Sequence, residues 1–175
     1  TVISTGDKDM AQLVNPHVSL INTMSNETLD EAGVVAKFGV APQRIVDYLS
    51  LIGDTVDNVP GVPKVGPKTA VKWLAEYDSL DNIIANADKI GGVVGQNMRN
   101  TLDWLPMAKQ LVTIKCDLPL PQGPADLVPQ PQDTATLAAL FERFEFKTWL
   151  REIQATALQT NTNAVSSPAV SQSQS

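Results

Sequence analysis

Apolar and polar positions alternate in short runs at the start of the chain and at helical spacing thereafter. Residues 1–5 are β-branched or small and run into Gly6-Asp7, which predicts a buried strand with a turn behind it. A second short strand is predicted at residues 18–22, after an Asn-Pro turn. From residue 26 onward the spacing predicts two helices, which end near Gly39 and at Gly53.

The later part of the chain has helical spacing broken by a proline-rich stretch. The pattern predicts helices at 68–77, 80–85 and 134–149, a helix and then a short strand near 111–114 within 98–118, and a crossing segment at 119–131. Residues 153–175 carry no charge and consist mostly of Gln, Thr, Asn, Ser and Ala, which predicts a disordered linker. We therefore expect the end of an α/β core at 1–25, a helical region at 26–152 and a linker at 153–175. A chain that starts inside a strand and ends in a linker is expected to be a fragment.

Composition and charge narrow the function. The chain of 175 residues is 43% hydrophobic and 18% charged, which is typical of a soluble globular protein, and it has no apolar run long enough to cross a membrane. Its one cysteine, Cys116, excludes an internal disulfide and fits a cytoplasmic protein, and its one histidine, His17, is interpreted as a loop residue. A net charge of −6 excludes a protein that coats nucleic acid by bulk electrostatics, but it allows a local basic patch.

Two pairs of aspartates follow predicted apolar elements. Asp7 and Asp9 come after the first strand, and Asp54 and Asp57 come after the helix that ends at Gly53. Alternate residues of an extended segment point the same way, and carboxylate oxygens are ligands that Mg²⁺ prefers. Each pair also fits an ordinary role in a turn or at a helix N-cap. Two such pairs in a short chain favour one shared metal site, because clustered carboxylates repel each other unless cations neutralise them.

A loop rich in glycine and proline follows the second pair and leads into the predicted helix at 68–77. Glycines allow positive φ or a close approach of the backbone to a ligand, and amides at a helix N-terminus suit a phosphate. Three lysines recur here every four residues with no acidic residue between them, which favours contact with phosphates regardless of base sequence. The alternative is a tight turn with a solvated lysine face. The candidate DNA-binding residues are Gly61, Val62, Lys64, Val65, Gly66, Lys68, Thr69 and Lys72.

Three stretches, taken together, resemble the 5′-nuclease domain of bacterial DNA polymerase I. They are residues 5–14 (TGDKDMAQLV), residues 51–70 (LIGDTVDNVPGVPKVGPKTA) and residues 145–149 (EFKTW). The resemblance extends from residue 1 to about residue 152, in the family's order and spacing. It implies an α/β core with a partial parallel sheet of the PIN-like, 5′-nuclease type, followed by a mainly α-helical subdomain. That subdomain would contain a helix–three-turn–helix clamp at about residues 52–77, and the whole would be dominated by helices.

The resemblance also implies an activity, ligands and partners. It implies a structure-specific 5′-3′ exonuclease and flap endonuclease of DNA replication and repair, in which divalent metal ions activate water. Mg²⁺ or Mn²⁺ would be held by Asp7, Asp9, Asp54 and Asp57, the catalytic carboxylates. The clamp would grip duplex or flapped DNA, or RNA–DNA primer junctions, with K⁺ at the clamp. A monomer is expected, with exonuclease and polymerase domains downstream.

One departure from the family changes the expected activity of this chain. The family's site also takes acidic residues from an N-terminal half, together with a basic helical arch, and this sequence contains neither. We therefore expect a half site that binds duplex weakly and cleaves poorly alone. Two alternatives remain. The uncharged linker disfavours a stand-alone 5′-exonuclease, and the four aspartates disfavour a non-catalytic DNA-binding module that uses only the clamp.

Overall fold

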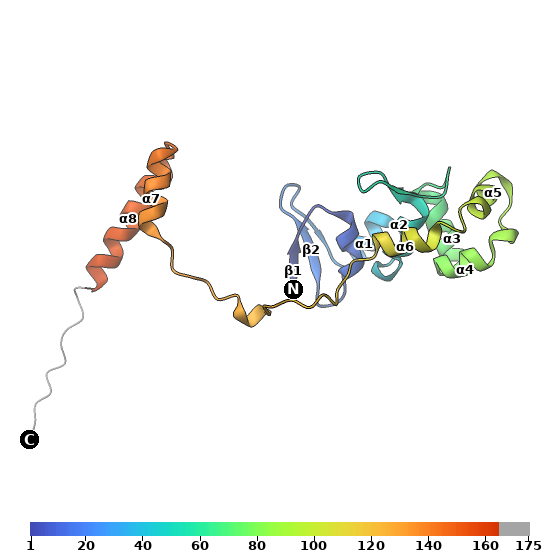
Figure 1. Cartoon of the computed structure of the whole chain (residues 1–175), viewed down its shortest axis with the longest axis horizontal. Helices are drawn as coiled ribbons and strands as arrows, with labels where there is room; N and C mark the ends of the chain where they lie inside the picture. Colours follow the sequence, from blue (N-terminus) through green and yellow to red (C-terminus); the bar gives the residue numbers. More distant parts are fainter. Residues whose placement is uncertain (165–175) are drawn as a thin grey trace, which may run out of the picture. The chain divides into compact units, whose positions relative to one another are not determined.

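The computed structural model describes residues 1–164, with side chains placed through residue 155. The chain forms two compact units, Thr1–Leu118 and Pro119–Ser175 (Figure 1). The first unit holds a small sheet and most of the helices, and the second holds a pair of helices. None of the described helices is long and apolar enough to cross a membrane.

A three-stranded sheet forms one end of the first unit, and helices α4 and α5 lie at the other end (Figure 1). Its strands are β1 (Val2–Ser4), β2 (Ser19–Asn22) and β3 (Glu27–Leu29). β1 pairs in parallel with β2, and β3 pairs antiparallel with β2, so that buried Leu20 stands opposite both Ile3 and Leu29. The two predicted strands are confirmed, but the predicted burial of the first is wrong, because Val2 and Ser4 of β1 are exposed. A 3₁₀ helix, η1 (Lys8–Leu13), lies between β1 and β2.

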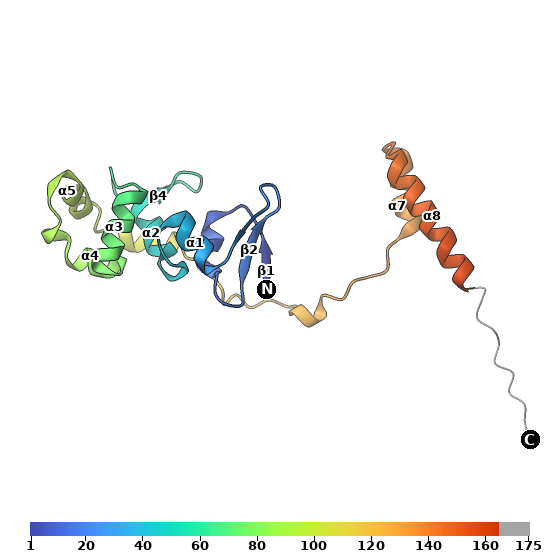
Figure 2. The same cartoon turned by 180° about the vertical axis from the view of Figure 1, so that it is seen from behind.

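Helices form the rest of the first unit, around a core that runs through α2. Their bounds are α1 (Glu31–Phe38), η2 (Pro42–Arg44), α2 (Ile45–Ile52), α3 (Pro67–Tyr77), α4 (Leu80–Ala85), η3 (Ala87–Lys89), α5 (Gly92–Asn100) and α6 (Leu105–Val112). α2 packs against α3 and α6, as both views show (Figures 1 and 2). The predicted helix ends at Gly39 and Gly53 and the predicted helices at 68–77 and 80–85 are confirmed. Between α2 and α3, strands β4 (Gly53–Asp54) and β5 (Val59–Pro60) pair antiparallel.

The strand predicted near residues 111–114 is wrong. α6 instead continues through Val112, with Leu105, Ala108 and Val112 buried on one face. Leu111 and Val112 therefore belong to a helix, because packing decides the conformation of a short ambiguous run, and the chain becomes extended only at Thr113. Beyond α6, the amide of Ile114 donates to the side chain of Gln12, so this segment is held by a side chain in place of a strand partner.

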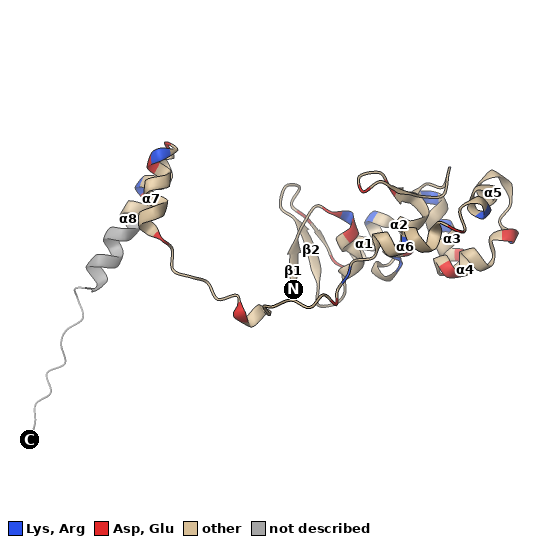
Figure 3. Ribbon diagram, viewed as in Figure 1, with Lys and Arg blue, Asp and Glu red and all other residues tan. Residues whose placement is uncertain are grey.

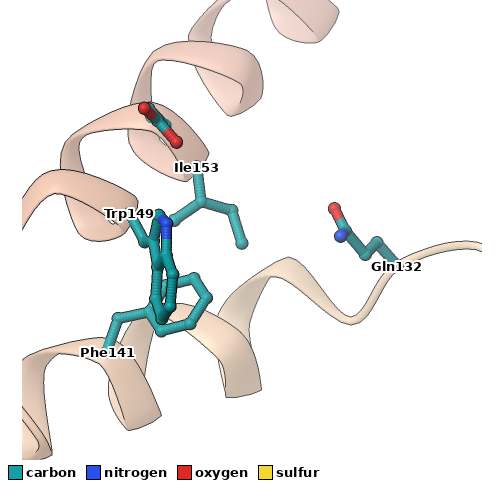
Figure 4. A pocket seen from close by; sticks show the side chains of 5 residues that line it. Gln132, Phe141, Trp149 and Ile153 are labelled. Carbon is teal, nitrogen blue, oxygen red and sulfur yellow. The ribbon is translucent and has the colours of Figure 1, made fainter. Parts of the chain in front are cut away.

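The second unit contains a 3₁₀ helix, η4 (Pro124–Asp126), and then a hairpin of α7 (Thr134–Arg143) and α8 (Lys147–Ala164). The prediction of one helix at 134–149 is wrong, because residue Glu145 takes a left-handed φ of 58° between the two helices. A groove of about 450 Å³ opens beside Phe141 and Trp149, whose ring centroids lie 5.7 Å apart (Figure 4). In place of the predicted linker at 153–175, α8 continues to residue 164. The rest of that predicted linker lies outside the described residues.

Candidate metal centre and nucleic-acid interface

Three aspartates from two separate parts of the first unit converge on one point. Each of Asp9, Asp54 and Asp57 offers a carboxylate oxygen, and these oxygens lie within 4.8 Å of one another. Asp9 lies in η1, which follows strand β1 in the chain. Asp54 ends the short strand β4, and Asp57 lies in the β4–β5 turn. The prediction that the two acidic pairs lie close together is thus met by one member of the first pair and both members of the second.

Asp7 occupies a different place from the one its spacing predicts. The chain is not extended from Asp7 to Asp9, because Asp7 is the N-cap of η1 and its Oδ1 accepts the backbone N–H of Asp9 at 3.0 Å. The helix-cap role that is typical of such a pair therefore applies to Asp7. It still lines the same pocket of about 350 Å³ as Asp54 and Asp57, although it is not one of the three converging carboxylates.

A lysine lies among these carboxylates. The Nζ of Lys8 is 2.7 Å from Oδ2 of Asp54, whose side chain is only 3% exposed. The other oxygen of Asp54, Oδ1, accepts the N–H of Val56 at 2.9 Å. The hydrogen bond from Lys8 is the largest of the effects that lower the pKa of the Asp54 carboxyl, which is therefore held ionised.

The environment of Asp9 is the opposite. Burial, followed by the negative charges of Asp7 and Asp54, raises the pKa of Asp9 to about 6. One of its carboxylate oxygens, Oδ1, is buried and has no hydrogen-bond partner. A buried carboxylate oxygen without a partner, beside two other carboxylates, is a donor set suited to a hard divalent cation. The residues present therefore fit the metal that the sequence predicts.

The loop before α3 is closed on the end of α2 by its own backbone. The backbones of Gly53 and Gly61 pass so closely that a Cβ on either would overlap main-chain atoms of the other segment. Gly53 also has a φ of 77°, which few other residues adopt. The expected close approach at Gly61 therefore exists, but it is to the protein's own chain. This crossing fixes the turn that carries Asp54 and Asp57 against the start of the glycine loop.

The candidate DNA-binding residues of this loop divide into buried anchors and exposed positions. Val62 and Val65 are buried, and their amides donate to Leu51 and to Val62, respectively, so neither is available for a phosphate. The residue with positive φ is Lys64, at 65°, in place of a glycine. Gly66 is the N-cap of α3 in extended backbone, and its carbonyl accepts the amides of Thr69 and Ala70.

The exposed lysines lie on the loop and along α3. Lys68 and Lys72 are one helical turn apart on α3, and their side chains are exposed, as is that of Lys64 before the helix. Lys68 is the second residue of α3, where the N–H has no intrahelical acceptor. Basic and acidic positions are otherwise interspersed along the first unit, so that this stretch is a local basic feature on an acidic chain (Figure 3).

Two side chains from outside the loop hold it in place, and the sequence does not single them out. The indole N–H of Trp104 donates to the carbonyl of Pro60 at 2.7 Å, and the Nδ2 of Asn97 donates to the carbonyl of Pro63, also at 2.7 Å. Both donors lie more than 30 positions later in the sequence, so no local pattern could connect them with the loop. Lys8 was missed for a similar reason, since only the fold brings it to Asp54.

Comparison with known proteins decides the family. The family model described as "5'-3' exonuclease, C-terminal SAM fold" matches residues 40–135, which is more than half of the chain. The chain belongs to this 5′-3′ exonuclease family. The matched segment contains Asp54, Asp57 and the whole glycine loop, whereas Asp9 lies before it.

Relatives of the 5′-3′ exonuclease family match most of this chain. DNA polymerase I of Pseudomonas aeruginosa is 42% identical over 170 residues, which are 93% of this chain and 19% of that protein. A 5′-3′ exonuclease of Aquifex aeolicus is 38% identical over 151 residues, which are 86% of this chain and 51% of that protein. The chain thus spans about half or less of the length of these relatives.

Solved structures with the same fold are nucleases of T5. A T5 5′-exonuclease superposes with a TM-score of 0.60 at 20% identity, over 63% of this chain and 46% of that one. A T5 D15 flap endonuclease, described as a pseudo-enzyme–product complex with DNA and metal ions, gives a TM-score of 0.60 at 19% identity, over 63% of this chain and 42% of that one. At this identity the likeness establishes the fold of the 5′-3′ exonuclease family, which is helix-rich with a small sheet.

Proposed function

We propose that this chain supplies the C-terminal part of a divalent-metal-dependent 5′-3′ exonuclease and flap endonuclease of a DNA polymerase I, acting in DNA replication and repair. The observation that carries the proposal is that carboxylate oxygens of Asp9, from η1, and of Asp54 and Asp57, from the β4–β5 hairpin that precedes the glycine loop, lie within 4.8 Å of one another. In this proposal residues 1–25 end a PIN-like nuclease core, and about 52–77 form the helix–three-turn–helix clamp.

The metal would be Mg²⁺ or Mn²⁺, held by Asp9, Asp54 and Asp57, with Asp7 lining a pocket together with Asp54 and Asp57. A bound divalent cation would supply electrostatic stabilisation of the charge that develops on the phosphodiester oxygens. The protein's own contribution is to hold the carboxylates in place. Asp7 fixes the start of η1 and thereby Asp9, and the N–H of Val56 fixes Asp54.

The DNA backbone would be held by the loop and the first turns of α3. The N–H of Lys68 in the first turn of α3 and the ammonium groups of Lys64, Lys68 and Lys72 suit phosphates, and they carry no means of reading bases. Gly61 and Thr69 would support this contact, and the buried Val62 and Val65 would anchor it in the core. The substrates proposed are flapped duplex DNA and RNA–DNA primer junctions, with K⁺ at the clamp.

Binding of a fluorescent 5′-flapped duplex by the chain, with Mn²⁺ or with EDTA, tests the proposal. Mn²⁺ is expected to strengthen binding by about tenfold, because it neutralises carboxylates that otherwise repel phosphates. The double variant Asp54→Asn with Asp57→Asn should lose this response, whereas Asp103→Asn, an exposed aspartate outside the cluster, should keep it.

A non-catalytic DNA-binding module would behave differently in the same measurement. Its affinity for the duplex would be the same with Mn²⁺ and EDTA, and the double variant would bind more tightly in both. That result would overturn the nuclease proposal and leave the clamp alone. Cleavage of the flap by the chain in Mn²⁺, lost in the double variant, would support the nuclease directly.

A further inference from the structure

The ammonium group of Lys8 lies against the acidic cluster that Asp9, Asp54 and Asp57 form. This ammonium is 2.7 Å from Oδ2 of Asp54, and Lys8 lines the same pocket as Asp54 and Asp57. One lysine charge therefore faces three carboxylates whose oxygens lie within 4.8 Å of one another. The compensation is incomplete, as the partnerless buried Oδ1 of Asp9 shows.

The two oxygens of Asp54 both have partners inside the protein. Oδ1 accepts the N–H of Val56, which belongs to the β4–β5 turn, and Oδ2 pairs with Lys8. The bond to Val56 is part of the fixed backbone, whereas the bond to Lys8 comes from a long side chain that is 37% exposed. Of the two, only the lysine can be withdrawn without rearranging the turn, because its flexible stem lets the ammonium move into water.

We propose that Lys8 is a built-in counter-ion that occupies the place of the metal on Asp54 and leaves it when a divalent cation binds. This inference rests on the proposed function, in which Asp9, Asp54 and Asp57 hold the cation. A divalent ion carries twice the charge of the ammonium and can serve all three carboxylates, including the oxygen of Asp9 that Lys8 leaves without a partner.

The exchange has two consequences for the protein. Without metal, the ion pair with Lys8 holds the Asp54 carboxylate in place, so that the site is formed before the cation arrives. When a metal ion binds, it must displace the ion pair between Lys8 and Asp54. Lys8 therefore lowers the affinity of the site for metal ions, and only cations that bind the carboxylates strongly occupy it. Lys8 is therefore a positioning residue whose removal changes metal affinity.

Amine labelling of the wild-type chain tests the displacement itself. The chain is treated with a limiting amine-reactive reagent with and without saturating Mn²⁺, and the labelled lysines are quantified by mass spectrometry. Labelling of Lys8 is expected to rise several-fold with Mn²⁺, because the freed ammonium is accessible. The exposed Lys89, whose ammonium donates to the side chain of Asn86 at 2.7 Å, serves as the internal control and should not change.

Calorimetric titration with Mn²⁺ tests the consequence. Lys8→Met is expected to bind Mn²⁺ about tenfold more tightly than wild type. Lys89→Met, which removes one exposed charge of the same unit outside the pockets that Lys8 lines, should bind as wild type does.

The outcomes separate this inference from the function on which it rests. If wild type binds Mn²⁺ through Asp54 and Asp57 but labelling of Lys8 stays constant or falls, the counter-ion role is overturned and the metal site stands. If Mn²⁺ binding is absent, or is unchanged in Asp54→Asn with Asp57→Asn, the proposed function fails and the inference with it. The labelling result decides the matter even where Lys8→Met does not fold.

Discussion

At the scale of single residues, the candidate site sets two aspartates in opposite electrostatic environments. Asp54 accepts from Lys8 and from Val56, and its pKa is lowered. Asp9 is shielded from water beside other carboxylates, and its pKa is raised to about 6. A raised carboxyl pKa means that the folded chain holds a proton more tightly than the unfolded chain does, so that ionising Asp9 costs stability unless a cation compensates.

Because ionising Asp9 costs stability, Asp9→Asn in EDTA should change the free energy of unfolding by an amount that depends on pH. Between the ordinary pKa of 3.8 and about 6, the folded state binds more protons, so the wild type loses stability as pH rises through that window. The variant removes this loss. It should be more stable than wild type by about 1 kcal/mol at pH 8, after allowing for solvent screening, and equal to it below about pH 4.

Chemical denaturation of wild type and Asp9→Asn at pH 8 and at about pH 4 measures the difference in the free energy of unfolding. Asp103→Asn, at an exposed position outside the cluster, is the matched control and should shift neither value. A stabilisation that is equal at both pH values would contradict the assigned cause, because it would not depend on the charge of Asp9.

Gly61 tests the backbone crossing that positions the acidic turn. A methyl group at Gly61 would overlap the backbone of Ile52 and Gly53, whereas one at Gly66 would meet nothing within 4 Å. Gly61→Ala should lower the free energy of unfolding by about 3 kcal/mol. Gly66→Ala, at an ordinary φ of −110°, should change it by less than about 0.5 kcal/mol. Thermal unfolding followed by circular dichroism measures both, and equal effects would contradict the crossing.

At the scale of elements, the glycine loop is held from three sides. The loop follows the paired strands β4 and β5 and leads into α3, whose N-cap is Gly66. Asn97 of α5 and Trp104, just before α6, donate to the carbonyls of Pro63 and Pro60. A loop restrained in this way has little conformational freedom left to lose when it meets a phosphate backbone. The ordering cost of binding is therefore low.

The support of the loop predicts that Asn97 acts on DNA binding without touching DNA. Asn97→Ala removes the hydrogen bond to the carbonyl of Pro63 and should weaken binding of flapped duplex about three- to tenfold. Because no phosphate contact is lost, the dependence of log affinity on log salt should keep its slope. Fluorescence anisotropy at several salt concentrations measures both quantities.

The matched control for Asn97 lies on the same helix. Asn100 is exposed and pairs with Gln96, so Asn100→Ala should leave the affinity unchanged. A changed salt slope in Asn97→Ala would instead assign Asn97 a direct phosphate contact, and an unchanged affinity would contradict the positioning role.

At the scale of the whole molecule, an acidic chain with a net charge of −6 must rely on a local basic feature to hold DNA. We expect a plot of log affinity for flapped duplex against log salt concentration to have a slope of about −3, as expected for about three phosphate contacts. The double variant Lys64→Ala with Lys68→Ala should reduce the magnitude of that slope by about 2. Lys115→Ala, an exposed lysine paired with Asp117, should leave the slope unchanged. An unaltered slope in the double variant would remove these lysines from the interface.

The sequence predicts this fold best where local chemistry decides it. Glycine at a left-handed C-cap ends α1, and periodic apolar residues define α2, α3 and α4, so these elements follow from the sequence. The sequence does not predict the structure correctly where tertiary packing decides the conformation of a segment. Leu111 and Val112 have the composition of a strand, yet the burial of one face of α6 keeps both in that helix, and the break between α7 and α8 depends on one left-handed residue, Glu145.

The candidate site divides in the same way. The acidic pairs and the glycine loop stand out as motifs, so Asp9, Asp54, Asp57 and the loop residues could be named from the sequence. Which aspartates converge depends on Asp7 being the N-cap of η1, and that short helix has no strong periodic signal. The roles of Lys8, Asn97 and Trp104 arise from contacts across the fold, which no spacing along the chain encodes.

A crystal of the chain grown with Mn²⁺ shows whether the converging carboxylates hold a divalent metal. One anomalous scattering peak is expected within bonding distance of carboxylate oxygens of Asp9, Asp54 and Asp57. If a crystal with saturating Mn²⁺ has no peak at this site, or has peaks only at other carboxylates, these three residues do not form the metal site.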